Sequence, residues 1–298
     1  MTQLVLVELF KLRKRWMLWI LLGILIAFLA LLQFGMYLGY RSVENESRGQ
    51  VPMSERERHL SEMRQALTLP RSVEFTFGMT QSVGGILLVI LAASVFGAEY
   101  AWGTVRSTLI RGVNRANYLI SKLTAVLLIG LAGLVVAFVV GFIFSLITTA
   151  MMRDSVDWSF LSGLFFPRLL AMFGRTWFVM AIPVSLAVMV SVLTRSSAFG
   201  IGIGIAYGIL EAIVVGILSN ISGWGEAVRL YTIGYNTTAV MAWNSLSGEP
   251  FSMGFNLGGG ISGTVVNFWK AWGLLVGYGA FFLALTFYVF KKRDISAS

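Results

Sequence analysis

Side chains that could carry out covalent or acid–base chemistry are scarce in this sequence. Its 298 residues include no cysteine and one histidine, His59, which excludes thiolate nucleophiles and sites built from several histidines. His59 lies among charged residues, and we interpret it as a solvated surface side chain. The apolar segments contain no aspartate, so Ser–His–Asp triads and aspartyl dyads cannot form within them. The nucleotide-binding pattern G-x-x-x-x-G-K-[ST] is also absent, and we therefore expect neither an enzyme nor a cofactor bound to this chain.

Two charged residues inside the apolar segments could interact with each other or with a solute. Arg175 and Glu211 lie in successive apolar segments on either side of Arg195. Counted along helices from Arg195, they lie at depths of about 30 Å and about 24 Å. Charged side chains in a bilayer are usually paired. We therefore predict an intramembrane ion pair with a structural role, and a pair that gates a substrate is the alternative.

A short basic segment, residues 99–122, joins two other apolar segments and could form a compact turn structure. Gly103 permits a sharp turn, and Thr104 is a good N-cap for a helix of about two turns. Gly112 can end this helix in a left-handed conformation. Asn114 is then placed to cap the helix that follows.

This short helix would present apolar and basic side chains to its surroundings. Such a surface suits a soluble partner that has an apolar groove with an acidic rim. The residues that we assign to this docking site are Glu99, Gly103, Thr104, Val105, Arg106, Leu109, Ile110, Arg111, Gly112 and Arg115.

The elements that must position these residues are membrane helices. The chain is 57% hydrophobic and 12% charged, with a mean hydropathy of +0.79, whereas soluble domains are about 25% charged. Six apolar runs are long enough to cross about 30 Å of hydrocarbon. The predicted spans are residues 16–37, 77–98, 123–148, 169–193, 198–218 and 268–290. The sequence thus predicts an all-α polytopic membrane protein with one transmembrane domain, residues 1–298.

The basic residues are distributed unevenly between the two sides of such a bundle. If the N-terminus, residues 99–122, the turn at Arg195 and the C-terminus share one side, that side carries the whole formal net charge of +9. The positive-inside rule then predicts a multi-pass protein of the cytoplasmic membrane with both termini in the cytoplasm. Contact with lipid headgroups accounts for most of these charges. Nucleic-acid binding is not expected, because the basic residues are scattered over several short segments.

The N-terminal segment, residues 1–15, is predicted to form an interfacial helix on the cytoplasmic surface. Its charged residues, among them Glu8 and Lys11, gather on one face, and its apolar residues spread over the rest. Such a helix would lie along the cytoplasmic surface before the chain turns inward at Trp16.

Two long segments are predicted on the outer side. The first, residues 41–76, contains a capping box that begins at Ser54, followed by a short amphipathic helix that ends before Pro70. The second, residues 219–267, is long and apolar enough that part of it could re-enter the outer leaflet as short helices.

Small residues recur at every fourth position along the fifth predicted span. Such a stripe allows another helix to approach closely, so it predicts packing rather than chemistry. The stripe consists of Ser196, Gly200, Gly204, Gly208, Ala212 and Gly216.

In residues 99–122 the chain resembles the ABC-2 family of ABC-transporter permeases. The residues that carry the resemblance are Glu99, Gly103 and Thr104, Arg106, Arg111 and Gly112, Arg115 and Lys122. They are similar to the coupling-helix region of that family. The resemblance extends over the whole chain and is nearest to small bacterial permeases of the bacitracin-resistance, lantibiotic-immunity and sodium-extrusion type.

The resemblance implies a permease without an ATPase domain of its own. It implies pairing with a second permease copy or a close relative, and binding to cytosolic ABC ATPase subunits that hold the ATP and magnesium. The expected activity is export of an amphipathic peptide, lipid-like or drug-like substrate. An ion-coupled secondary transporter and a non-transporting membrane sensor or structural protein are the alternatives.

Overall fold

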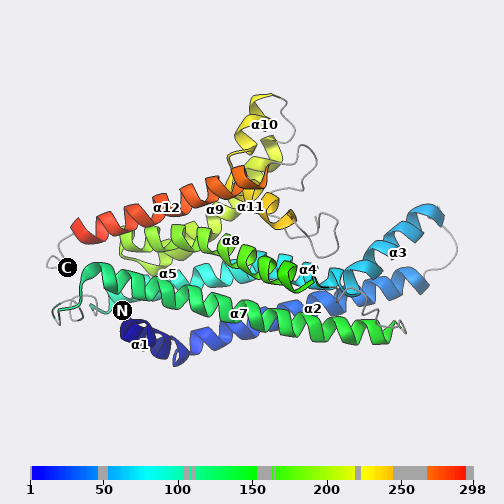
Figure 1. Cartoon of the computed structure of the whole chain (residues 1–298), viewed down its shortest axis with the longest axis horizontal. Helices are drawn as coiled ribbons and strands as arrows, with labels where there is room; N and C mark the ends of the chain where they lie inside the picture. Colours follow the sequence, from blue (N-terminus) through cyan, green and yellow to red (C-terminus); the bar gives the residue numbers. More distant parts are fainter. Residues whose placement is uncertain are drawn as a thin grey trace.

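A computed structural model of the chain describes most of the sequence as helix (Figure 1). The described residues are 2–45, 53–103, 108, 110, 112–152, 163, 165–218, 223–243 and 267–292. Within these ranges every regular element is helical, and six helical segments are long and apolar enough to cross a membrane. The predicted class of all-α polytopic membrane protein is therefore confirmed.

The six membrane-length segments each contain one of the predicted spans. The second is built from an α-helix, a π-helical turn and a further α-helix, which we denote α4, η1 and α5. The segments are α2 (Trp16–Asn45), α4 (Arg71–Met79) with η1 (Thr80–Gly84) and α5 (Gly85–Ala101), α7 (Arg115–Met151), α8 (Phe165–Thr194), α9 (Ser197–Leu218) and α12 (Phe268–Lys292). α7 has 37 residues and is therefore about 55 Å long, well beyond the hydrocarbon thickness.

The first outer loop is shorter than predicted, because both of its ends are helical. α2 continues through Asn45, and the second span begins at Arg71 rather than at Phe77. The short helix expected between them is present as α3 (Met53–Leu67), with Pro70 beyond its end. Polar residues of α4 face the interior of the bundle, so a search for apolar runs placed the boundary too late.

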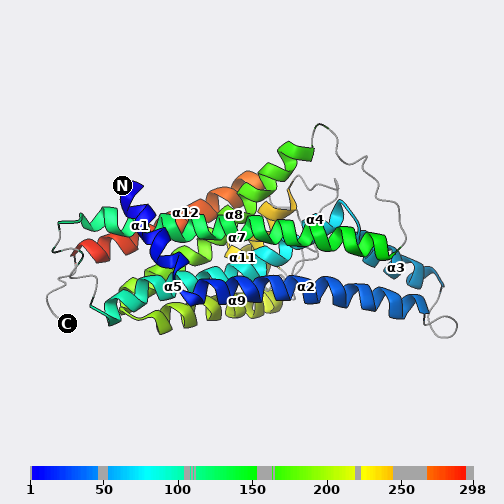
Figure 2. The same ribbon diagram turned by 90° about the horizontal axis from the view of Figure 1, so that it is seen from below.

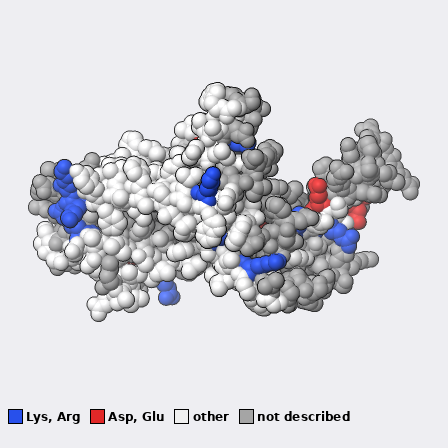
Figure 3. Space-filling view, turned by 45° about the horizontal axis from the view of Figure 1, so that its top comes forward, with Lys and Arg blue, Asp and Glu red and all other residues white. Residues whose placement is uncertain are grey.

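Both described ends of the chain lie at the same end of the bundle. α1 (Thr2–Arg13), the last turn of α5, the first turn of α7 and the last turn of α12 meet there, while α3 lies at the opposite end (Figures 1 and 2). Lysine and arginine side chains gather at the first of these ends, and acidic side chains are visible near α3 (Figure 3). We call these two ends the basic end and the far end.

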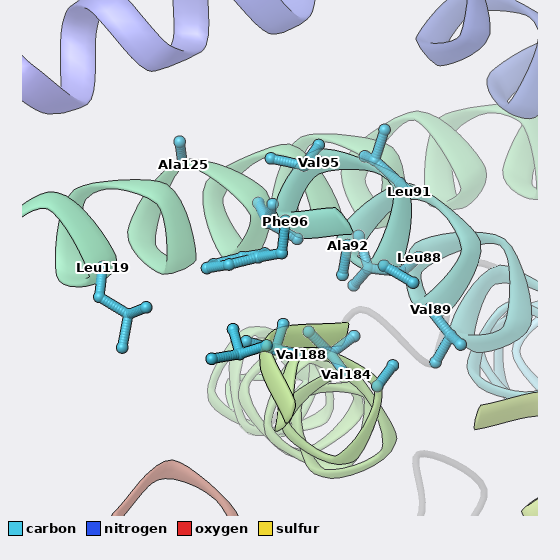
Figure 4. Close-up of a cluster of buried hydrophobic side chains, with 14 of the residues drawn as sticks. Leu88, Val89, Leu91, Ala92, Val95, Phe96, Leu119, Ala125, Val184 and Val188 are labelled. Atoms are coloured by element: carbon cyan, nitrogen blue, oxygen red, sulfur yellow. The ribbon is translucent and has the colours of Figure 1, made fainter. Parts of the chain in front are cut away.

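α5 forms the centre of the bundle and packs against α7, α8 and α9. Its apolar side chains form a buried cluster with residues of α7 and α8 (Figure 4). In lipid such contacts stabilise the bundle by close packing rather than by exclusion of water. The labelled members of the cluster are Leu88, Val89, Leu91, Ala92, Val95, Phe96, Leu119, Ala125, Val184 and Val188.

α9 approaches α5 and α8 through small residues. A Cβ atom added to Gly200 would lie 3.0 Å from Ala93 Cβ, and one added to Gly204 would lie 2.7 Å from Val89 Cγ1. The predicted stripe therefore packs closely in its first half. At Gly216 no atom of the described residues lies within 4 Å of an added Cβ, so close packing within the chain is seen only in the first half of the stripe.

Two short helices follow α9, as expected for the second outer segment. α10 (Trp224–Arg229) projects from the bundle, and α11 (Ile233–Ala242) is buried against α8 and α12 (Figure 1). The rest of the predicted segment, residues 219–222 and 244–266, lies outside the described residues.

Candidate functional site

A buried lysine joins two carboxylates at the basic end. Lys122 Nζ, on α7, lies 3.3 Å from Glu8 Oε2 of α1 and forms a second ion pair with Glu99 Oε1 of α5. Its side chain is 1% exposed. An ammonium group has three N–H donors, so one lysine can serve both carboxylates. Lys122 therefore connects three helices that are distant in sequence.

Tyr118 extends this network to a fourth helix. Its hydroxyl donates a hydrogen bond to Glu99 Oε2, and its ring centroid lies 5.1 Å from Lys122 Nζ. The ring also stacks on Phe290 of α12, with ring centroids 5.8 Å apart and an interplanar angle of 7°. Arg115 also reaches α12, donating to the Lys291 carbonyl at 2.8 Å. We refer to Glu8, Glu99, Tyr118 and Lys122 as the ion network.

The start of α7 explains why these side chains point the same way. Asn114 has an extended backbone, and its side chain accepts a hydrogen bond from the Ala116 amide. It is thus the N-cap that the sequence predicts. Tyr118 and Lys122 follow at a spacing of four residues, which places them on one face of the helix.

α1 contacts the bundle through its acidic residue. Glu8 is buried rather than exposed, and Lys11 supports it from the edge, with Nζ 2.8 Å from Glu8 Oε1. The exposed side chains of α1 include Leu6, Val7 and Phe10. The helix therefore turns an apolar face outward, as an interfacial helix in contact with lipid does, and uses its acid to bind α7.

The Glu8 carboxyl should make the stability of the basic end depend on pH. Burial alone would raise its pKa, but Lys122 and Lys11 together hold the pKa below the ordinary value of 4.5. The stabilisation is then fully present above pH 4.5 and is lost as the pH falls through the lower pKa of the folded state. We expect the wild type to unfold at a higher temperature than Glu8→Gln at pH 7, and this difference to shrink below about pH 4.5. Thermal unfolding in detergent across this range measures it, and a difference that persists unchanged at pH 3 would contradict it.

The segment between α5 and α7 leaves apolar side chains uncovered at the basic end. Trp102 is 66% exposed and Ile110, which is helical, is 75% exposed. Gly103 and Gly112 have φ angles of +64° and +85°, the left-handed backbone that favours glycine, so the turns expected at both positions are present. The remaining predicted docking residues lie outside the described part of the chain: Thr104, Val105, Arg106, Leu109 and Arg111.

Two of the predicted docking residues have other surroundings in the structure. Glu99 is 6% exposed and belongs to the ion network, so it supports the segment from beneath and offers no surface to a partner. Arg115 hydrogen-bonds to the end of α12. Both residues therefore have contacts within the chain that the sequence did not predict.

The predicted ion pair between Arg175 and Glu211 does not form. Glu211 Oε1 accepts a hydrogen bond from the Gly234 amide at 2.7 Å, and the carboxylate also accepts from the Ile233 amide and the Tyr207 hydroxyl. The charged group that acts on Arg175 is Glu74 of α4. The pairing was missed because Glu74 had been assigned to the outer loop, whereas α4 carries it into the bundle.

Sequence reasoning missed the roles of Glu8, Tyr118 and Lys122. Glu8 and Lys122 were each explained as part of the charge distribution at the membrane surface. A usable signal was present, because Glu99 and Lys122 both adjoin apolar runs, where an unpaired charge would be costly. An acid and a base at facing ends of consecutive helices indicate a buried pair.

Comparison with known proteins identifies the family of this chain. A family model described as "Protein of unknown function (DUF2705)" matches residues 57–296. The "Uncharacterized protein YhcI" of Bacillus subtilis (strain 168) is 24% identical over 220 residues, which cover 71% of this chain and 64% of that protein. The match thus spans less than two thirds of the length of this relative. The family model extends from α3 to the end of α12 and so covers most of the fold, and the chain belongs to the DUF2705 family.

Proposed function

We propose that this protein is the membrane subunit of an ATP-driven exporter, an ABC-2 type permease that depends on a separate cytosolic ATPase. One observation carries the proposal: at the basic end, an exposed apolar surface lies next to the ion network, which can act as a rigid support. Trp102 and Ile110 are uncovered, and the ion network beneath them joins α1, α5 and α7. Force applied to this surface would reach several membrane helices at once.

The ion network is suited to transmit movement because its charges are buried. Separating Lys122 from Glu8 or Glu99 would leave charged groups without partners in a region of low dielectric constant, which is costly. α1, α5 and the start of α7 should therefore move together as one unit when an ATPase subunit binds or closes. The far end would respond through the long helices α2 and α7.

In this proposal the basic end faces the cytoplasm, in agreement with the positive-inside rule. The ATPase subunits hold the ATP and magnesium, and a second permease copy or close relative completes the transporter. The cargo is an amphipathic peptide, lipid-like or drug-like molecule. A cytoplasmic membrane location follows from the same orientation.

A substitution at Ile110 tests the docking surface. Ile110→Glu places an acid on the exposed apolar surface. The protein is cross-linked in its native membrane and purified, and the ATP hydrolysis that co-purifies with it is measured. We expect this activity to fall at least about tenfold in the variant. The control Val228→Glu introduces the same charge at another exposed aliphatic side chain, on α10, and should have no effect. Equal co-purified activity in both variants would contradict the docking surface.

Dependence on nucleotide distinguishes the proposed ATP-driven exporter from an ion-coupled transporter. The observation that favours the ion-coupled transporter is Glu211, an acid in a membrane-length helix, because such groups can carry protons or cations. Purified protein reconstituted without nucleotide or ATPase should not move cargo against a gradient if the proposal holds. Transport driven by an ion gradient alone would reject it.

A further inference from the structure

A cavity of about 430 Å³ lies between η1 and α5 on one side and α8, α9 and α11 on the other. This volume falls within the range of small-molecule sites, about 300–1,000 Å³. Most of its wall is aliphatic, including Val89, Val179, Met180 and Ile205. The cavity lies among membrane-length helices, so it is suited to a molecule with a substantial apolar part.

Glu211 is the acidic residue in this wall. Its carboxylate accepts hydrogen bonds from the Gly234 and Ile233 amides at the start of α11 and from the Tyr207 hydroxyl. No lysine or arginine is among the described residues of the lining. Within the described ranges no salt bridge to Glu211 is formed. A carboxylate at this depth is costly unless a cation accompanies it. These donors serve the carboxylate oxygens, but no cationic side chain of the described lining balances the negative charge.

The remaining polar groups of the lining are already engaged or uncharged. Thr237 Oγ1 donates to the Ile233 carbonyl, and Ser82 Oγ donates to the Gly78 carbonyl. The rings of Tyr207 and Phe28 also line the cavity, and aromatic rings attract organic cations. One carboxylate with aliphatic and aromatic walls is a poor site for Ca²⁺ or Mg²⁺, which require several oxygen ligands.

A second cavity in the bundle differs from the first in the chemistry of its lining. It measures about 230 Å³ and lies between α2, α5 and α7. Its lining is leucine-rich, with residues such as Leu18, Leu22 and Leu87, and no charged residue is among the described residues that form it. Such a cavity can accept a hydrocarbon chain but has no means of selecting a charge. The Glu211 cavity combines apolar volume with a fixed negative group.

We propose that the Glu211 cavity binds an amphipathic organic cation, with Glu211 as its counter-ion and the aliphatic walls holding its apolar part. The π-helical turn η1 contributes to this wall through Gln81, Ser82 and Val83, and such turns often occur at functional sites. This inference rests on the proposed function in identifying the bound molecule as cargo. The binding itself requires no ATPase.

The test uses two probes of nearly equal shape and opposite charge, tetraphenylphosphonium and tetraphenylborate. Purified full-length protein in nanodiscs should bind the phosphonium saturably, above the partitioning into empty nanodiscs, and should bind the borate at least about tenfold more weakly. Glu211→Gln should reduce phosphonium affinity at least about tenfold. Glu44→Gln, which removes an exposed carboxylate from the far end of α2, is the matched control and should leave binding unchanged.

A second variant keeps the test decisive if Glu211→Gln does not fold. Ile205→Trp enlarges a half-buried side chain of the lining while retaining the carboxylate, and it should also abolish phosphonium binding. Equal binding of the two probes, or unchanged phosphonium binding in the folded variants, would overturn the inference. Phosphonium binding without any co-purifying ATPase would reject the proposed function alone. ATPase coupling without phosphonium binding would reject only this inference.

Discussion

Replacement of Lys122 by methionine is expected to lower the free energy of unfolding by about 3–5 kcal/mol. Methionine approximates the length of lysine but removes the charge that Glu8 and Glu99 share. Both carboxylates would then remain buried without their cation, and removing one partner of a buried ion pair is far more costly than removing the whole set. Denaturant unfolding in mixed micelles, followed by circular dichroism, measures the loss.

Two comparisons isolate the cause of this loss. Lys11→Met removes a lysine whose side chain is 48% exposed and should cost less than about 1 kcal/mol. Adding Glu8→Gln and Glu99→Gln to Lys122→Met neutralises the whole network and should recover most of the lost stability. If Lys122→Met proves as stable as Lys11→Met, the network does not hold the basic end together.

The second large effect is expected from Gly97→Ala, at the contact between α5 and α9. A Cβ atom at this position would lie 2.2 Å from the backbone nitrogen of Ser197 and 2.3 Å from its Cα. No side-chain rotation can relieve an overlap with backbone atoms, so α9 must move away from α5. We expect a cost of about 1–3 kcal/mol or more, measured as a lower unfolding temperature and a reduced yield of folded protein.

Gly202→Ala supplies the control with the same chemical change. Gly202 lies on α9, and nothing lies within 4 Å of a Cβ atom added there. Alanine is preferred to glycine inside a helix by about 1 kcal/mol, so this variant should be unchanged or slightly more stable. Opposite signs for the two substitutions would show that the close approach of α5 and α9 is responsible. A stable Gly97→Ala protein would show that the helices can separate at little cost.

The membrane-length helices were predictable because a span needs little more than a long apolar run. Their ends were not, since a hydropathy reading treats polar residues as outside the membrane. Ser72 and Glu74 are buried in α4, where the Ser72 hydroxyl lies 2.6 Å from that of Ser145. Only the partner helix reveals that these residues belong inside. The same effect concealed the continuation of α2 to Asn45.

The sequence predicted where the candidate site lies, and the structure corrected which of its residues contact one another. Local signals were sufficient for the Asn114 cap and for the left-handed turns at Gly103 and Gly112, because cap and turn preferences act over a few residues. The partner of Glu8 was not predicted, since it is Lys122, 114 residues away along the chain. Pairs that form between distant helices leave only a weak trace in a single sequence.

The π-helical turn η1 sets the rotational phase between the two halves of the second span. The five residues of Thr80–Gly84 turn the chain about as far as four residues of a regular α-helix, because a π-helical turn holds about one residue more than an α-helical turn. Deleting one of them would therefore leave Ser72 facing Ser145 and α5 in its place in the core. A deletion within α5 itself would instead rotate every contact beyond it by about 100°, so this turn is the one place where the second span can lose a residue and keep its packing.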